Sequence, residues 1–402
     1  MKVSKSFQWS DRNPVRLLVC LLATPPTAVS WADESPLDTL QVHGFLSQAL
    51  IVTDNNDFFG ASSQKAGSLE FTELGVNASL RPSPNMLIAA QLLSRRAGGE
   101  IRDAKPTLDY GVIDYQMVSN QERTLGLQAG RFKNPLGFYN QTRDIAFTRP
   151  SILLPQSIYF DRTRSIGIAA DGVSVYLEER ISTGTLRMSG GIGRPQTGSG
   201  LSRQLFGNTI GSVSSSTPSA IAQILYENQN GKFLAALSAA NVNLDTDIAG
   251  NPAEFNFQPW VASLQYNDDL WSLTAEFALR QQSLEGDNIP TSFDITGQSW
   301  YLQYQRRMTP TWSWLVRYDS LINNNADRSG YQYEQSGFGP AHSQFADDIT
   351  IGLQWTPSAH LMLAGEYHHV NGTGWLPGQD NPDSSATQQH WNMLLFQLSL
   401  RF

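Results

Sequence analysis

The chain has 402 residues, and its 28 basic against 36 acidic side chains give a net charge of −8. Only 16% of the residues are charged, while Phe, Trp and Tyr make up 10%. A chain this acidic is not expected to bind nucleic acid. Its single cysteine, Cys20, excludes a disulfide framework.

The N-terminal segment has the pattern of a secretory signal peptide. Four basic residues flank the start of a short apolar run from Leu17 to Val29, and Ser30 and Ala32 suit a cleavage site. We expect cleavage after Ala32, which makes residues 1–32 the signal peptide and 33–402 one domain. A lipoprotein site at Cys20 is the alternative. Removing the four basic residues and one acidic residue of this segment leaves 24 basic against 35 acidic residues, a net charge of −11.

The segment from Trp271 to Arg280 is the clearest predicted strand. Apolar and polar side chains alternate along it, and a period of two places them on opposite faces of a sheet. The apolar face carries Trp271, Leu273, Ala275, Phe277 and Leu279, and the other carries Ser272, Thr274, Glu276 and Arg280. The chain repeats this pattern without helices or apolar second faces to cover so much sheet. Lipid outside and water inside explain the pattern best.

Sixteen strands of this kind are predicted. They begin at Leu40, Leu69, Met86, Thr107, Thr124, Gly167, Thr185, Ala220, Phe233, Pro259, Trp271, Ser299, Trp312, Ile349, Leu361 and Trp391. We therefore predict an all-β fold, a 16-stranded antiparallel transmembrane β-barrel with both termini on the periplasmic side. A barrel of this size is wide enough to hold an aqueous channel.

The predicted connections alternate between short and long. Seven short turns are rich in Pro, Asn, Asp and Gly, which fix turn geometry. Eight long loops connect the other ends of the strands: 54–65, 98–105, 131–164, 194–219, 245–257, 282–297, 323–347 and 372–390. Short periplasmic turns and long outer loops are typical of bacterial outer-membrane barrels.

The third long loop, Arg131 to Arg164, is called loop three here. Loops of about thirty residues are usually functional, and we expect this one to fold into the bore and narrow it. Six basic residues outnumber two acidic ones, Asp144 and Asp161, and the predicted constriction consists of Arg131, Lys133, Arg143, Arg149, Arg162 and Arg164. An arginine ring favours anions in pores. The alternative is that these side chains pair with carboxylates and hold the loop down. Arg143 and Arg149 are the best pore candidates, and Arg162 and Arg164 the best anchors.

Other charges are expected on strands that face the lumen. The basic candidates are Arg187, Arg280 and Arg317, and the acidic ones are Glu276, Asp319 and Glu366. Of the adjacent His368 and His369, alternation directs only one inward, so a metal site is not expected. The Asp54–Asp57 segment lacks the Gly and distal Glu of a calcium loop and is interpreted as a solvated loop. No cofactor is expected.

The ends of the strands and of the chain carry further signals. Trp and Tyr side chains lie near predicted strand ends, where aromatic girdles belong. The chain closes with alternating apolar residues and a terminal Phe402, which resembles the insertion signal of outer-membrane barrels. The 130–137 segment, Gly-Arg-Phe-Lys-Asn-Pro-Leu-Gly, is similar to the loop-three entry of the phosphate-selective porin O and P family.

This resemblance to bacterial outer-membrane porins implies a homotrimeric channel whose third loop folds inward. Gly44 and Gln48, which interrupt the apolar face of the first strand, also suit a contact between protomers. Phosphate-selective members of the family are rich in lysine, whereas this chain has six, so the resemblance does not imply phosphate selectivity here.

From these observations we expect a water-filled channel in the outer-membrane lipid, not an enzyme. It would pass small hydrophilic solutes and favour anions because loop three is basic. Two alternatives remain at this point. One is a barrel hydrolase, for which His342 and Ser343 with Asp347 or Asp348 offer the residue types. The other is a structural or adhesion barrel without channel activity.

Overall fold

The structure is a computed structural model that describes residues 36–99, 104–161, 163–197, 201, 211–248, 250–289 and 292–402. The predicted signal peptide and Arg162 therefore lie outside the described residues. The strands are β1 (Gln41–Thr53), β2 (Ser68–Ser83), β3 (Met86–Ala97), β4 (Thr107–Ser119), β5 (Arg123–Lys133), β6 (Ala169–Ile181), β7 (Gly184–Pro195), β8 (Gly211–Ser214), β9 (Ser219–Asn228), β10 (Phe233–Ile248), β11 (Asn251–Asn267), β12 (Trp271–Gly286), β13 (Phe293–Arg307), β14 (Trp312–Ile322), β15 (Phe345–Ser358), β16 (Leu361–Gly372) and β17 (His390–Arg401).

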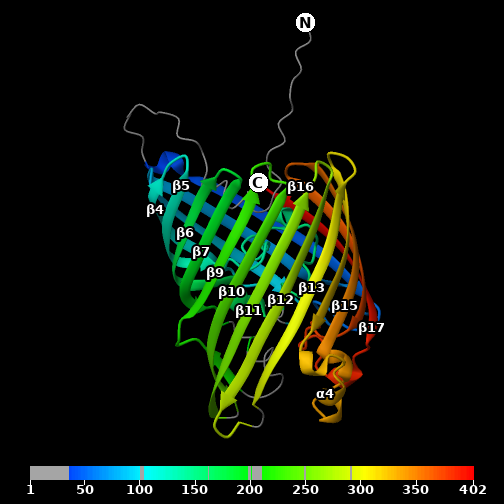
Figure 1. Cartoon of the computed structure of the whole chain (residues 1–402). Coiled ribbons are helices and arrows are strands. Elements are labelled where there is room, and N and C mark those ends of the chain that lie inside the picture. Colours follow the sequence, from blue (N-terminus) through cyan, green and yellow to red (C-terminus); the bar gives the residue numbers. More distant parts are fainter. Residues whose placement is uncertain are drawn as a thin grey trace.

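These strands form one closed antiparallel sheet, which confirms the predicted barrel (Figure 1). Each strand of the wall pairs with its neighbours in sequence, and β1 pairs with both β2 and β17. The four-residue β8 pairs with β10 beyond the end of β9. Because β8 and β9 together occupy one strand position beside β10, the barrel has sixteen strands. Where the first and last strands meet, Gly44 and Phe402 exchange two backbone hydrogen bonds of 3.0 Å.

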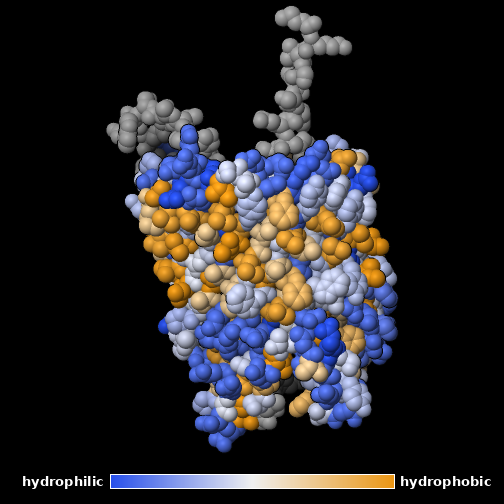
Figure 2. Space-filling view, in the orientation of Figure 1, coloured by the Kyte–Doolittle hydropathy of each residue, from blue (hydrophilic) through white to orange (hydrophobic). Residues whose placement is uncertain are grey.

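Along β12 the apolar side chains face outward and the polar ones face inward, the reverse of a sheet in a soluble protein. Leu273, Phe277 and Leu279 are exposed on the outer face, whereas Thr274, Glu276, Ala278 and Arg280 are buried inside. Figure 2 shows the result on the face in view, an apolar band between two polar ends. Because the apolar side chains of the strands face outward, the barrel wall presents to its surroundings the surface that lipid requires.

The connections sort into two ends of the barrel. The C-terminus lies at the end with the short turns, and helix α4 (Tyr331–Gln335) lies at the opposite end with the long loops (Figure 1). The remaining short helices are η1 (Pro36–Thr39), η2 (Ala146–Thr148), α2 (Arg164–Ile168), η3 (Asn325–Asp327), η4 (Ala341–Gln344) and η5 (Ser384–Ala386). Within the part of the chain that the structure describes, no helix is long and apolar enough to cross a membrane.

Two of the predicted long loops are wrong. β10 runs to Ile248 and β11 begins at Asn251, while β12 runs to Gly286 and β13 begins at Phe293. The strands continue because their backbones pair through this region: Asp245 stands opposite Glu254, and Phe255 opposite Leu284. These strands carry the wall beyond the apolar band, where apolar side chains such as Leu244, Phe255 and Leu284 face inward and polar ones face outward, the reverse of the pattern used for the prediction.

The connection from β5 to β6 runs into the barrel. The structure gives loop three the bounds 134–168, and most of its side chains are buried. Phe138, Tyr139 and Tyr159 pack against inward side chains of β9–β13. Ile152 and Leu153 join a cluster with Trp375 and Trp391 on the opposite wall. The loop therefore fills part of the bore, as the sequence predicted.

Candidate functional site

Glycine is required where the chain turns into the bore. At Gly130, with φ +119°, a Cβ atom would lie 2.2 Å from the carbonyl oxygen of Gly111. At Gly137, with φ +58°, it would lie 2.3 Å from the Tyr159 hydroxyl oxygen. Both positions combine a positive φ with a contact too close for any side chain. The two glycines of the 130–137 segment thus have a structural reason to be there.

Glu276 on β12 anchors the first part of loop three. Its carboxylate accepts hydrogen bonds from the Phe138 backbone N–H (2.9 Å) and from the hydroxyls of Tyr159 (2.6 Å) and Tyr301 (2.8 Å). Ser263 Oγ donates a further bond of 2.5 Å. Burial raises the pKa of Tyr159 well above its usual value, so its hydroxyl keeps its proton and remains a donor. One carboxylate thereby ties the loop to three wall strands.

Glu366 on β16 anchors the middle of loop three. It accepts hydrogen bonds from the backbone N–H groups of Ile152 and, at 3.2 Å, Leu153. His368 lies between this carboxylate and that of Asp348, at 3.3 Å and 2.7 Å. Arg317 of β14 adds a 3.0 Å bond from its guanidinium to Ser151 Oγ. The loop backbone is thus held at two points of the wall, on β12 and on β16.

A chain of buried ion pairs connects loop three to β2 and β3. Glu73 accepts from Arg149 at 2.7 Å and from Arg95 at 3.2 Å. Arg95 also binds Asp161 at 2.7 Å, and Asp161 lies 3.4 Å from Arg143. All five side chains are at least 90% buried. Three cations face two anions, so this network carries one positive charge.

A second buried group lies where loop three meets β4 and β5. Lys133 binds Asp109 at 2.7 Å and also Asp144, and Arg164 binds Asp144 from the far end of the loop. Two cations and two anions make this group neutral. Of the six residues predicted for the constriction, Lys133, Arg143, Arg149 and Arg164 therefore come together inside the barrel, each paired with a carboxylate.

Arg131 lies elsewhere. It shares the outward parity of Leu127 on β5, and it forms a bidentate pair with Asp171 of β6, with distances of 2.7 and 2.9 Å. Asp171 itself shares the outward parity of the exposed Val173. The expectation that Arg131 lines the bore is thus not met, because Arg131 still lies within β5 and alternates there with the inward, buried Phe132.

The three predicted lumen arginines do point inward. Arg187 binds Glu178 and Glu227 at 3.0 and 2.9 Å. Arg280 donates to the Ile322 carbonyl at 3.0 Å, and its guanidinium lies 5.0 Å from the ring centre of Phe160 in loop three. Arg317 lies 3.8 Å from Asp319. Arg280 and Arg317 are buried against loop three, whereas Arg187 is half-buried and lies on the other side of the barrel.

Sequence reasoning missed Glu73 and Arg95, the centre of the ion-pair chain. Both lie on predicted strands, and alternation with the outward Leu74 and Leu92 would have directed them inward. What the sequence does not show is that loop three brings Arg149 and Asp161 to them, since these pairs join residues 76 and 66 positions apart.

The residue types of a hydrolase are present but not assembled. His342 Nδ1 contacts Thr373 Oγ1 at 3.0 Å, while Ser343 Oγ donates to the Pro340 carbonyl. Asp347 accepts from Ser320 instead. His368 is buried and His369 exposed, and within the described ranges no group of three or more His, Cys, Asp or Glu is arranged to hold a metal ion.

Known structures with the same architecture are bacterial outer-membrane channels. No family model matches the chain, and no curated protein matches its sequence. The anion-selective porin from Comamonas acidovorans is 14% identical, with a TM-score of 0.57 over 90% of this chain and 99% of that one. This chain has the fold of a porin. The outer-membrane channel DcaP of Acinetobacter baumannii (12% identity, TM-score 0.56) and OmpF of Salmonella typhi (10%, 0.56) are similar too, each over 90% of this chain and 97% of that one.

Proposed function

We propose that the chain forms a water-filled channel in the outer membrane through which small hydrophilic solutes diffuse. The observation that carries the proposal is a closed barrel with an apolar outer face and a charged interior, narrowed by a loop tied to its walls. The porin fold supports it, as does the channel or porin function of the similar structures from Comamonas acidovorans and Acinetobacter baumannii. A hydrolase is disfavoured because His342, Ser343 and Asp347 bind other partners.

We further propose that the channel favours small anions. The buried network of loop three has one cation more than it has anions, and a charge acts most strongly where low-dielectric walls narrow the path. The acidic side chains of the outer loops are screened by salt beyond about 8–10 Å. Membership of the phosphate-selective porin O and P family and assembly as a homotrimer are proposals that rest on the sequence resemblance.

Conductance in a planar bilayer tests both proposals. The purified mature chain should give discrete open-channel steps in potassium chloride, and the reversal potential in a salt gradient should have the sign of chloride preference. A barrel that inserts but never conducts would refute the channel. A reversal potential with the sign of potassium preference would refute only the anion preference.

Replacing both Arg143 and Arg149 by Ala identifies the selectivity element. The double variant removes two of the three cations of the network, so we expect the chloride preference to fall clearly. Arg96→Ala on the outer face of β3, where Arg96 pairs with the half-buried Glu70, is the control and should leave the reversal potential as it is. An unchanged reversal potential in the double variant would show that loop three does not set selectivity.

A further inference from the structure

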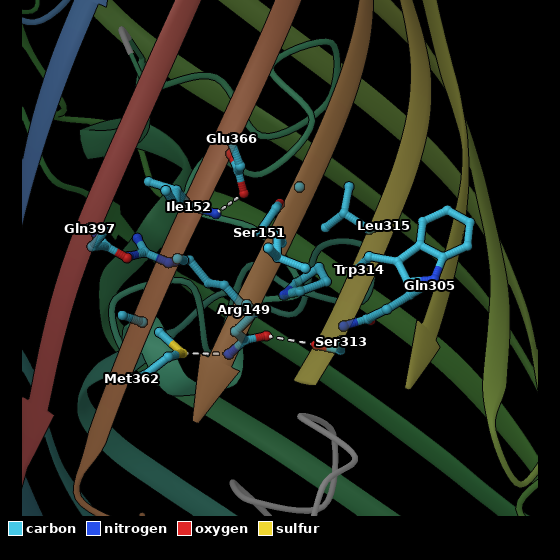
Figure 3. A pocket seen from close by; sticks show the side chains of 16 residues that line it. Arg149, Ser151, Ile152, Gln305, Ser313, Trp314, Leu315, Met362, Glu366 and Gln397 are labelled. Carbon is cyan, nitrogen blue, oxygen red and sulfur yellow. Dashed lines mark hydrogen bonds between the residues drawn. The ribbon is translucent and has the colours of Figure 1, made fainter. Parts of the chain in front are cut away.

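A pocket lies between the middle of loop three and the short-turn ends of β13–β17 (Figure 3). Loop three contributes Arg149 and Ser151 to its wall, and β17 contributes Gln397. It has room for about one water-sized group, about 10 Å³, and the empty space around its lining, which includes open solvent, measures about 320 Å³. The pocket therefore holds one small chemical group, and a larger solute extends from this narrow end into the open space.

Two hydrogen-bond donors line the pocket without an acceptor. Arg149 uses its Nη1 and Nη2 atoms on Glu73 and on the Arg143 carbonyl. Its Nε atom and the Nε2 atom of Gln397 are both buried, and neither has a partner among the described residues. Figure 3 shows the Arg149 side chain extending toward Gln397. Buried donors of this kind require an acceptor, and a planar group with two oxygens suits an arginine N–H beside an amide N–H.

The remaining wall is mostly apolar, with a few uncharged polar side chains and one carboxylate. Gln305, Ser313 and Gln354 present amides and a hydroxyl, which both donate and accept hydrogen bonds. Ser313 Oγ donates to Gln354 Oε1 at 3.4 Å, Gln354 Nε2 contacts Met362 Sδ, and Ser313 and Gln354 are half-buried. The one carboxylate at the pocket, Glu366, is already bound to the backbone of loop three and to His368. Its charge is thereby offset by groups outside the pocket.

We propose that this pocket binds small polyhydroxy carboxylates on their way through the channel. A carboxylate oxygen enters the narrow end and accepts hydrogen bonds from Arg149 Nε and Gln397 Nε2. The hydroxyl groups of the solute then contact Gln305, Ser313 and Gln354 in the wider part. The inference rests on the proposed channel function and adds to it a solute class and a binding position.

Single-channel recording with three probes tests the inference. Gluconate has a carboxylate and hydroxyls, propionate only the carboxylate, and sorbitol only the hydroxyls. We expect gluconate to interrupt the potassium chloride current with the longest residence time. Gln397→Met removes the amide at similar length, and Arg149→Lys keeps a positive charge for Glu73 but lacks the Nε donor. Each should shorten the gluconate residence about tenfold, the effect of one hydrogen bond to a charged group.

Gln128→Met on β5 is the matched control, because Gln128 also faces the bore but lies outside the pocket; it should leave gluconate residence as in the unmodified channel. Equal residence in the unmodified channel, Gln397→Met and Arg149→Lys would overturn the inference, as would sorbitol or propionate residence as long as that of gluconate. A channel that conducts potassium chloride but ignores gluconate refutes the inference alone. A barrel with no conductance refutes the proposed function as well.

Discussion

The two sides of the barrel interior differ in how much of their surface loop three covers. Along β12–β17 and β1–β3 most inward side chains are buried, and acidic groups such as Glu276, Glu366 and Glu73 bind the loop. Along β4–β7 many inward side chains, such as Gln128, Ser174, Tyr176 and Arg187, are half-buried. The same alternating sequence thus builds two surfaces. One holds the loop and the other is left for water and solute.

This difference explains how a chain with so many buried charges can remain stable. On the covered side, the buried carboxylates of Glu73, Glu276 and Glu366 have opposite charges or several hydrogen-bond donors, which offset their loss of hydration. On the open side, charges such as Arg187 keep contact with water and need less compensation. Substitutions on the covered side should therefore lower the stability of the barrel, whereas substitutions on the open side should mainly alter ion selectivity.

The largest loss of folding stability is expected from Glu276→Ala. The substitution leaves four buried donors, on Phe138, Tyr159, Ser263 and Tyr301, without their acceptor, and such losses cost about 3 kcal/mol or more. We expect a lower unfolding midpoint in urea and a larger, noisier conductance because loop three is released. Glu285→Ala, at an exposed position of the same strand, is the control. Equal unfolding midpoints for the two variants would contradict the proposed anchor.

An intermediate loss of folding stability is expected from Glu73→Gln. The change removes the charge that Arg95 and Arg149 share, and an uncompensated buried cation costs about 2 kcal/mol or more. Glu70→Gln on the outer face of the same strand breaks only the partly exposed pair with Arg96, which is worth less than about 1 kcal/mol. Chemical unfolding of both variants measures the difference. A larger loss for Glu70→Gln would reverse the assignment of inner and outer faces.

The smallest effect on stability, but a visible one on selectivity, is expected from Arg187→Ala. This residue lies on the open side, so its loss leaves Glu178 and Glu227 exposed to passing ions and should move the reversal potential toward potassium. Arg131→Ala removes a cation of the outer face and should not move it. If the two variants shifted the reversal potential equally, the open side would not be the ion path.

The sequence predicted the barrel because alternation is a local signal that each strand repeats. It placed Glu276 and Glu366 on the inner face correctly for the same reason. It failed at the start of β11, which the structure puts at Asn251 and the prediction at Pro259, because apolar residues such as Ala253 and Phe255 face inward there and polar residues face outward, the reverse of the lipid-facing pattern. It could not give the pairs of loop three with Glu73 and Arg95, which depend on how the loop packs across the bore.

Single-cysteine labelling tests the central claim, that loop three covers one side of the interior and leaves the other open. Ser189 on β7 is half-buried and faces inward on the open side, and Ser299 on β13 is fully buried on the covered side. Each is replaced by Cys in a Cys20→Ala background, and a water-soluble methanethiosulfonate is added to open channels. Because thiol reactivity follows exposure, Ser189→Cys should react at least about tenfold faster and lose current on labelling. Equal rates, or faster labelling of Ser299→Cys, would contradict the account.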